Sequence, residues 1–335
     1  MIYSYKREND ITLMTVLTAL LAMGFYVMSF FAATPENFMF SKGMVLNILF
    51  NQPAFSHPGT LSAIIAAAFT TINCFSIYYV GEKVLPDKSI ISFIPLTYLM
   101  LMTAMPEARF FTPYHIVTLM MIWAFYCVVN FRMNERNIEE LFLSILLVSV
   151  ASLFYLPMLW FTLLLILVNL SAEMDKLRYL LITITAIITP YIIYFGLIYL
   201  FWNLGEVQAK FAICLYYLKD IDIISFRSNH PAIIFASILG LATIISSVAV
   251  LANLDKAKVI IERAYVRIII VLLGMIGIVI VYGGSLTDLS GMMVFFPIPF
   301  LLFDFYTERA KKVPATIFFL IIAGALTYLK TTQLA

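Results

Sequence analysis

The residues of this sequence best suited to chemistry are five polar side chains that flank long apolar segments. They are two carboxylates, two arginines and a histidine, namely Glu36, Glu107, Arg109, Arg227 and His230. A carboxylate can act as a general base towards a hydroxyl group. An arginine can hold a phosphate through paired, charge-assisted hydrogen bonds. Together these side chains could bind a phosphate head group and still leave one carboxylate available as a base.

Each of these polar residues, taken alone, is most simply explained as a solvated loop residue. Glu36 follows an apolar run by three residues, and Glu107 and Arg109 stand between two other apolar runs. Arg227 precedes His230 just before a further apolar run. They would form a binding site only as a set that meets on one side of a membrane.

Familiar catalytic and metal-binding motifs are absent from the sequence. It contains no P-loop, no zinc-binding HExxH pattern and no GxSxG nucleophile elbow. The three histidines are scattered, and the three cysteines are far enough apart that we interpret them as small apolar packing residues. The motifs therefore identify no cofactor. They leave open whether a divalent metal binds beside the carboxylates.

The composition places these residues in a membrane protein. Of 335 residues, 63% are hydrophobic and 12% are charged, and the mean hydropathy is +0.98. A soluble domain usually has about 25% charged and about 45–50% apolar residues. A net charge of +2 leaves no basic excess for a nucleic-acid partner. The composition excludes a soluble enzyme and predicts an all-α, polytopic integral membrane helix bundle.

About eleven transmembrane helices are predicted, because a span needs about 20 mainly apolar residues. The apolar runs lie at 11–33, 60–80, 90–105, 112–131, 141–172, 179–201, 231–251, 268–284, 291–306 and 314–329. The run 141–172 is too long for one helix and short for two, and Pro157 lies at its middle. We interpret it as a tight hairpin that turns near Pro157. A single kinked helix would instead give ten spans.

The basic residues predict the orientation of these spans. With a cytoplasmic N-terminus, fifteen of the 21 lysines and arginines fall on the cytoplasmic side, as the positive-inside rule requires. The hairpin is favoured as well, because a single helix there would place every later basic loop outside. We therefore expect an outer C-terminus. The short loops and the lack of eukaryotic targeting signals indicate a bacterial inner (plasma) membrane.

Two long connections fall on the outer side in this topology, at 34–59 and 202–230. Each contains a partly apolar segment, 43–50 and 206–219, which we interpret as an interfacial helix. Neither connection is long enough for a soluble domain, so residues 1–335 are expected to form a single transmembrane domain. Two such segments on one side indicate a cavity that opens outward beside the polar set.

This layout resembles the GT-C superfamily of membrane glycosyltransferases over about residues 10–200. In that family a first span is followed by a long outer loop with an acidic residue near its start and membrane-lying helices. The sequence Thr34-Pro35-Glu36, followed by Met44–Phe50, is similar to that arrangement. Pro106-Glu107-Ala108-Arg109 is similar to a second acidic outer loop of the family. The helices at about 230–330 are additional to the resemblance.

The resemblance implies a protein that handles a polyprenyl-phosphate-linked sugar, or a related lipid, at the outer leaflet. In such an enzyme Glu36 would be the catalytic base, and Glu107 would orient the acceptor or hold a metal. Arg109, Arg227 and His230 would hold the phosphate.

The chain also looks like bacterial multi-pass families without an assigned function. Two other classes of function therefore stay open. It could be a non-catalytic integral membrane subunit or scaffold of a cell-envelope complex, with apolar helix faces for partner subunits. It could also be a lipid or solute transporter, although the sequence shows neither internal repeats nor broken helices at the midplane. In each case membrane lipids surround the protein.

The predicted topology is testable by labelling in intact cells. Residues 132–140, 253–267 and 308–312 hold nine of the 21 basic residues and should face the cytoplasm. Single cysteines placed in these segments should not react with a membrane-impermeant thiol reagent until the cells are opened. Strong labelling of any of the three segments in intact cells would contradict the topology.

Overall fold

The computed structural model describes most of the chain from residue 60 onward. It covers Leu20, Met23, Gly24, Val27 and residues 60–85, 91, 93–133, 138–170, 176–201, 203–219, 221, 230–252, 259–282, 289–304, 320–329 and 331. Within these residues all regular structure is helical and no strand occurs. The all-α class predicted from the composition is confirmed.

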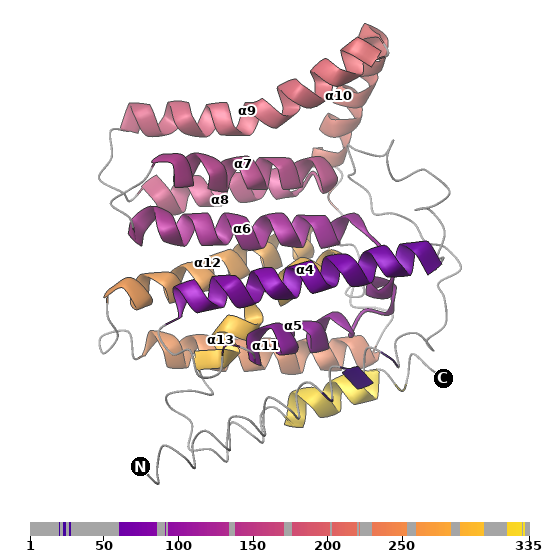
Figure 1. The fold of residues 1–335 in the computed structure, drawn as a ribbon, viewed down its shortest axis with the longest axis vertical. Coiled ribbons are helices and arrows are strands. Elements are labelled where there is room, and N and C mark those ends of the chain that lie inside the picture. Colours follow the sequence, from indigo (N-terminus) through magenta and orange to yellow (C-terminus); the bar gives the residue numbers. More distant parts are fainter. Residues whose placement is uncertain are drawn as a thin grey trace.

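Five of the described helices are long and apolar enough to cross a membrane. They are α4 (Thr60–Val84), α6 (Pro113–Met133), α9 (Lys176–Phe201), α11 (His230–Leu251) and α12 (Val259–Tyr282). They run side by side and pack with the shorter helices into one slab (Figure 1). The helices support the membrane location expected from the composition.

The apolar run around Pro157 forms two antiparallel helices, as the sequence predicts (Figure 1). Helix α7 (Ile138–Phe154) and helix α8 (Met158–Leu170) are joined by a three-residue turn that ends at Pro157. The amide of Met158 donates to the carbonyl of Tyr155 at 3.0 Å, which closes the turn. Proline suits this place because its missing N–H is not needed just before a helix. The hairpin is confirmed, with Pro157 buried in the turn.

Two other predicted spans, 90–105 and 291–306, are not continuous helices. Helix α5 (Phe93–Met102) has ten residues and leads through a turn into the 3-10 helix η1 (Pro106–Arg109). The second region consists of the 3-10 helix η3 (Leu289–Phe295), a turn that contains Pro297, and helix α13 (Ile298–Asp304). Proline lacks an N–H and disfavours helical geometry in the preceding residue, which explains both breaks. None of these pieces is long enough to cross a bilayer alone.

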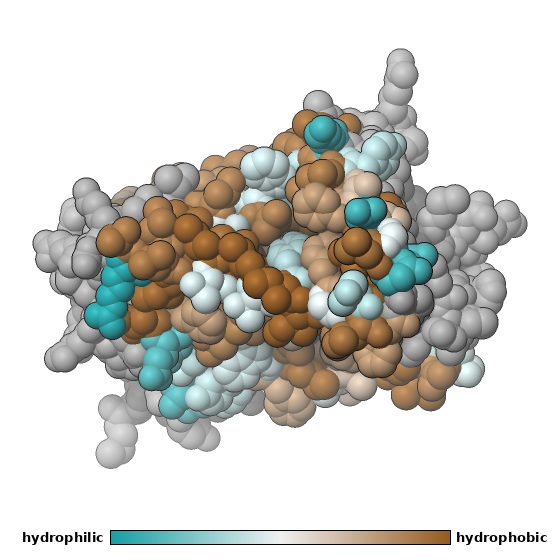
Figure 2. Space-filling view, turned by 90° about the horizontal axis from the view of Figure 1, so that it is seen from above, coloured by the Kyte–Doolittle hydropathy of each residue, from teal (hydrophilic) through white to brown (hydrophobic). Residues whose placement is uncertain are grey.

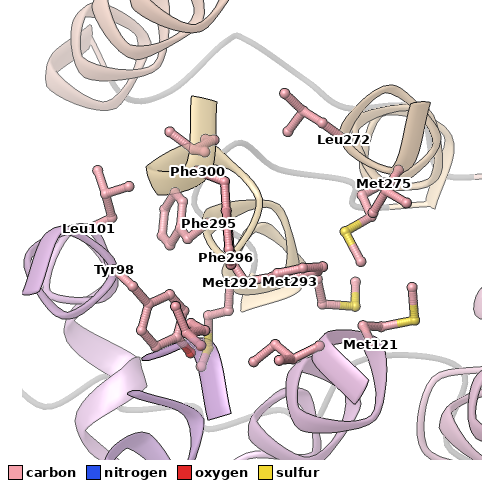
Figure 3. Close-up of a cluster of buried hydrophobic side chains, with 14 of the residues drawn as sticks. Tyr98, Leu101, Met121, Leu272, Met275, Met292, Met293, Phe295, Phe296 and Phe300 are labelled. Carbon is pink, nitrogen blue, oxygen red and sulfur yellow. The ribbon is translucent and has the colours of Figure 1, made fainter. Parts of the chain in front are cut away.

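Helix α6 is the central helix of the bundle. Two thirds of its apolar segment is buried, and it packs against α4, α7, α12 and η3. The 3-10 helix η3 lies beside α6 in the middle of the protein, where Met292 and Met293 are fully buried. Figure 3 shows these methionines together with Met121 and Met275 among aromatic rings. The flexible methionine side chain fills the irregular gaps that a broken helix leaves in a core.

The outward faces of the long helices are apolar. Large exposed hydrophobic side chains lie on α4, α9 and α11, among them Ile64, Phe75, Ile192, Leu200, Leu241 and Ile244. Figure 2 shows hydrophobic residues across the middle of one side and hydrophilic residues mainly towards its two ends. This distribution fits a helix bundle whose outer faces contact lipid tails.

One end of the bundle carries an aromatic group. This end, which we name the α7 end, contains the start of α7 and the end of α6 (Figure 1). The rings of Tyr79, Trp123 and Tyr126 lie 5.8 Å from one another, and the Nζ atom of Lys83 is 5.6 Å from the Tyr79 ring. Tyrosine, tryptophan and lysine are enriched where a helix leaves the lipid tails. Lys83, in the last turn of α4, therefore suits a membrane boundary on this side.

Helix α12 begins nine residues before the predicted span at 268. Arg267, expected in a loop, is instead a buried helical residue. Its Nη1 atom donates to the carbonyl of Val128 in α6 at 3.1 Å. The bond places a positive charge near the C-terminus of α6, where the helix dipole favours it.

Helix α9 lies at the edge of the slab and changes direction about halfway along (Figure 1). It contains Pro190, and a proline prevents the helix from closing its regular hydrogen bonds one turn earlier. Ser149 of α7 donates its hydroxyl to the carbonyl of Ile187 at 2.7 Å. One turn further, Ser152 and the hydroxyl of Tyr191 are 2.7 Å apart. Side chains of α7 thus satisfy polar groups of α9 beside its bend.

Helix α10 (Leu204–Lys219) corresponds to the predicted interfacial segment 206–219 and packs against α9. Asn203 caps its N-terminus, because its Oδ1 atom accepts from the amide of Glu206 at 2.9 Å. Cys214 is buried on the inner face, whereas Phe211 is 53% exposed although its ring packs edge-on against Phe195. Burial raises the pKa of the Cys214 thiol. Cys214 is thus a packing residue, as the sequence predicts.

The contact between Ser149 and the bend in α9 yields a stability prediction. Ser149→Ala should lower the free energy of unfolding by about 1 kcal/mol, because side-chain hydrogen bonds between membrane helices contribute about 0.6 to about 1.7 kcal/mol. In a Pro190→Ala background the same change should cost less, since a regular helix would let the amide of Tyr191 donate to the carbonyl of Ile187. The measurement is equilibrium unfolding in mixed detergent micelles.

Ser144→Ala is the matched control for this experiment. Ser144 is also a buried serine of α7, but it donates within its own helix, to the carbonyl of Leu141 at 2.8 Å. Its loss should change stability less than Ser149→Ala. Equal effects of Ser149→Ala with and without Pro190 would show that the serine does not compensate for the proline.

Candidate functional site

A group of buried polar side chains surrounds η1 at the end of the bundle opposite the α7 end (Figure 1). We name this end the η1 end; it also contains the starts of α4, α6 and α11. The group, named here the η1 polar cluster, consists of Ser62, Thr70, Asn73, Thr103, Arg109, Thr112 and His115. All seven are buried. Buried polar groups in a membrane protein are costly, so such a concentration indicates a function or a demanding local backbone.

Arg109 is the charged member of this cluster and is only 3% exposed. Its guanidinium carbon lies 4.9 Å from the centre of the Phe110 ring, which is a favourable cation–π distance. The simple explanation of Arg109 as a solvated loop residue is therefore wrong. The reason is that η1 folds back against α4 and η3 instead of extending into solvent.

A small pocket lies beside Arg109. Its polar lining residues are Arg109, Thr70 and Thr103, and the remainder of its wall is apolar. Its volume is about 10 Å³, which is enough for about one water molecule. In this structure the pocket beside the guanidinium is therefore too small for a phosphate.

His115, at the start of α6, connects α6 to η1. The amide of Thr112 donates to Nδ1 of His115 at 3.2 Å. Because an amide can only donate, Nδ1 is the acceptor and the proton is assigned to Nε2. Nε2 then donates to the carbonyl of Ala108, next to Arg109, at 3.2 Å. A neutral, fully buried histidine thus contacts both ends of the short connection from η1 to α6.

Helix α4 holds the same connection from the other side. The amide of Phe111 donates to the carbonyl of Ser62 at 3.1 Å and to its hydroxyl at 3.0 Å. The Asn73 amide nitrogen donates to the backbone carbonyl of His115 at 3.2 Å and to the hydroxyl of Tyr98 at 3.4 Å. The segment around Arg109 is therefore tied to both α4 and α6.

Only part of the predicted site lies within the residues that the structure describes. Arg109 and His230 lie at the same end of the bundle, the first buried and the second exposed at the start of α11. Glu107 belongs to η1, but its side chain is outside the described residues, as are Glu36, Arg227 and the segment 43–50. The meeting of the two carboxylates with Arg109 stays a prediction.

Sequence reasoning missed the residues that hold Arg109 in place. Thr112 followed by Pro113 is a helix-start signal, and a histidine follows three residues after Thr112. That pattern could have identified His115 as a capping residue. Ser62 and Asn73 carry no comparable signal, because their partners are 49 and 42 residues away in the chain. Among the described residues no three histidine, cysteine or acidic side chains gather as metal ligands.

Comparison with known proteins identifies no relative for this chain. The sequence matches no protein-family model and shows no significant match to a curated protein.

The contrast between buried and exposed residues at the η1 end is directly testable. In a variant without native cysteines, His230→Cys should react readily with a water-soluble thiol reagent, because position 230 is exposed. Thr103→Cys should react only after unfolding in SDS, because position 103 is buried. Comparable labelling of both folded variants would show that η1 does not close over the cluster.

Proposed function

We propose that the protein binds a polyprenyl-phosphate-linked sugar, or a related lipid phosphate, at the η1 end of the bundle, in the manner of a GT-C glycosyltransferase. The observation that carries this proposal is the buried Arg109 on a short 3-10 helix between membrane helices. Phosphate suits the planar group of donors that an arginine side chain presents.

The surroundings of Arg109 suit an amphiphilic ligand. Ser62 and Thr70 of α4 belong to the buried cluster, while Leu61 and Ile64 on the same part of α4 are exposed to the surroundings of the bundle. A phosphate near the guanidinium and an isoprenoid tail along the outer face of α4 would use both properties. Because the pocket holds about one water molecule, binding requires η1 to move or the head group to approach from the undescribed segments.

The roles proposed for the other site residues are those that the resemblance to the GT-C superfamily implies. Glu36 is proposed as the base that activates the acceptor hydroxyl, and Glu107 as the residue that orients the acceptor or holds a divalent metal. Arg227 and the exposed His230 are proposed as further phosphate ligands, which would approach Arg109 from the α10–α11 connection. The reaction would transfer the sugar to the acceptor and leave the polyprenyl phosphate behind.

The proposed setting is a bacterial plasma membrane with the η1 end outside and the N-terminus inside. Lys83 at the α7 end supports this orientation, since the positive-inside rule places basic residues at the cytoplasmic ends of helices. Helix α10, at the outer side in this orientation, would lie near the lipid head groups.

A second candidate function is lipid or solute transport. The observation that favours it is the pair of broken elements, α5–η1 and η3–α13, which pack against each other inside the bundle. Irregular backbone at membrane depth is frequent where transporters bind their substrates. A non-catalytic envelope subunit is the third class; it would need no ligand at Arg109.

The binding proposal predicts a specific loss of affinity. Arg109→Gln should weaken binding of a short-chain polyprenyl phosphate by about 10- to 100-fold, because hydrogen bonds to a charged group contribute about 1.5–3 kcal/mol. Arg178→Gln is the control, since Arg178 is an exposed arginine of α9 near the α7 end. The measurement is calorimetric titration of the protein in nanodiscs. Absence of binding to the unaltered protein would favour the subunit class.

The catalytic role of Glu36 is separable from binding. Glu36→Gln should abolish sugar transfer and leave the affinity for the lipid phosphate nearly unchanged, because the amide keeps the shape of the side chain but cannot accept the proton. Transfer is measured with a labelled lipid-linked sugar. Binding without any transfer by the unaltered protein would favour the transport function, which a flux measurement in proteoliposomes would then test.

A further inference from the structure

We propose that His115 is the residue that positions Arg109 for its anionic ligand. His115 does so through the hydrogen bond from its Nε2 atom to the carbonyl of Ala108. The ligand part of this inference rests on the proposed function, whereas the positioning part rests only on the contacts of the described residues.

The carbonyl of Ala108 needs a partner because of where it lies. It is one residue from the end of η1, and the last carbonyls of a helix have no partner within the helix. Ala108 is buried, so solvent does not replace the missing donor. Nε2 of His115 supplies that donor at 3.2 Å. The backbone immediately before Arg109 is thereby connected to α6.

The backbone after Arg109 is held independently. The amide of Phe111 donates to Ser62 of α4, and the ring of Phe111 stacks on that of His115 at 6.0 Å. Arg109 therefore lies between two anchored residues, one tied to α6 and one to α4. Of these anchors only the bond to Ala108 depends on a side-chain N–H, so a substitution of His115 that removes this donor and keeps the acceptor for Thr112 can release the side before the arginine alone.

The two ring nitrogens of His115 make different hydrogen bonds, and two substitutions can test these bonds separately. Asparagine places its amide group where Nδ1 lies, so His115→Asn can still accept from Thr112 but cannot reach Ala108. Glutamine places an N–H₂ group where Nε2 lies, so His115→Gln can still donate to Ala108. If His115 positions Arg109, glutamine should substitute for histidine and asparagine should not.

The experiment measures hydrogen exchange and ligand affinity for the full chain in nanodiscs. In His115→Asn the amides of 108–111 should exchange at least about tenfold faster than in the unaltered protein, and the affinity for a short-chain polyprenyl phosphate should fall by about tenfold. His115→Gln should stay near the unaltered protein in both measurements. Peptides from α9 serve as the control for general unfolding.

The outcomes separate this inference from the proposed function. If the unaltered protein binds no lipid phosphate, the proposed function fails, while the exchange of 108–111 still decides whether His115 holds the segment. Equal exchange in His115→Asn and His115→Gln would overturn the inference. So would faster exchange in α9 together with 108–111, because His115 would then stabilise the whole bundle instead of positioning Arg109.

Discussion

Backbone amides and carbonyls that are shielded from water must find partners inside the protein, and much of this structure follows from that constraint. Long helices satisfy it by themselves. Elements α5–η1 and η3–α13 do not, because prolines interrupt them. The η3–α13 pair packs against α6, the α5–η1 pair packs against α4, and the two pairs pack against each other, so that side chains and turns supply the missing partners.

The polar residues around η1 can be understood in the same terms. Ser62 accepts from the amide of Phe111, and His115 donates to the carbonyl of Ala108. Each satisfies a backbone group of an irregular segment, and together they hold Arg109 in a buried position. The partners that the irregular backbone needs are thus supplied by one cluster.

At the edge of the bundle, fewer neighbouring helices are available to satisfy polar groups that are shielded from water. Among the described elements, helix α9 packs mainly against α7 and less against α10 and α8, and most of its apolar surface faces outward. Ser149 and Ser152 compensate for the bend beside Pro190. A bend stabilised by two serines allows α9 to follow α7 at one end and to carry α10 at the other.

Properties that depend on composition and local order could be predicted from the sequence. The apolar content required membrane helices, and the length of the run around Pro157 together with its central proline predicted the α7–α8 hairpin. The other properties depend on packing between segments that are far apart in the chain. The runs 90–105 and 291–306 look like spans because they are apolar, but apolar residues suit a protein interior as well as a bilayer. Arg109 looks like a loop residue because its neighbours in the sequence are a turn. The connection that follows Arg109 is held by Ser62, which is 49 residues away in the chain, and no local pattern encodes that contact. His115 is seven residues from its partner Ala108, so the local helix-start pattern could have identified it.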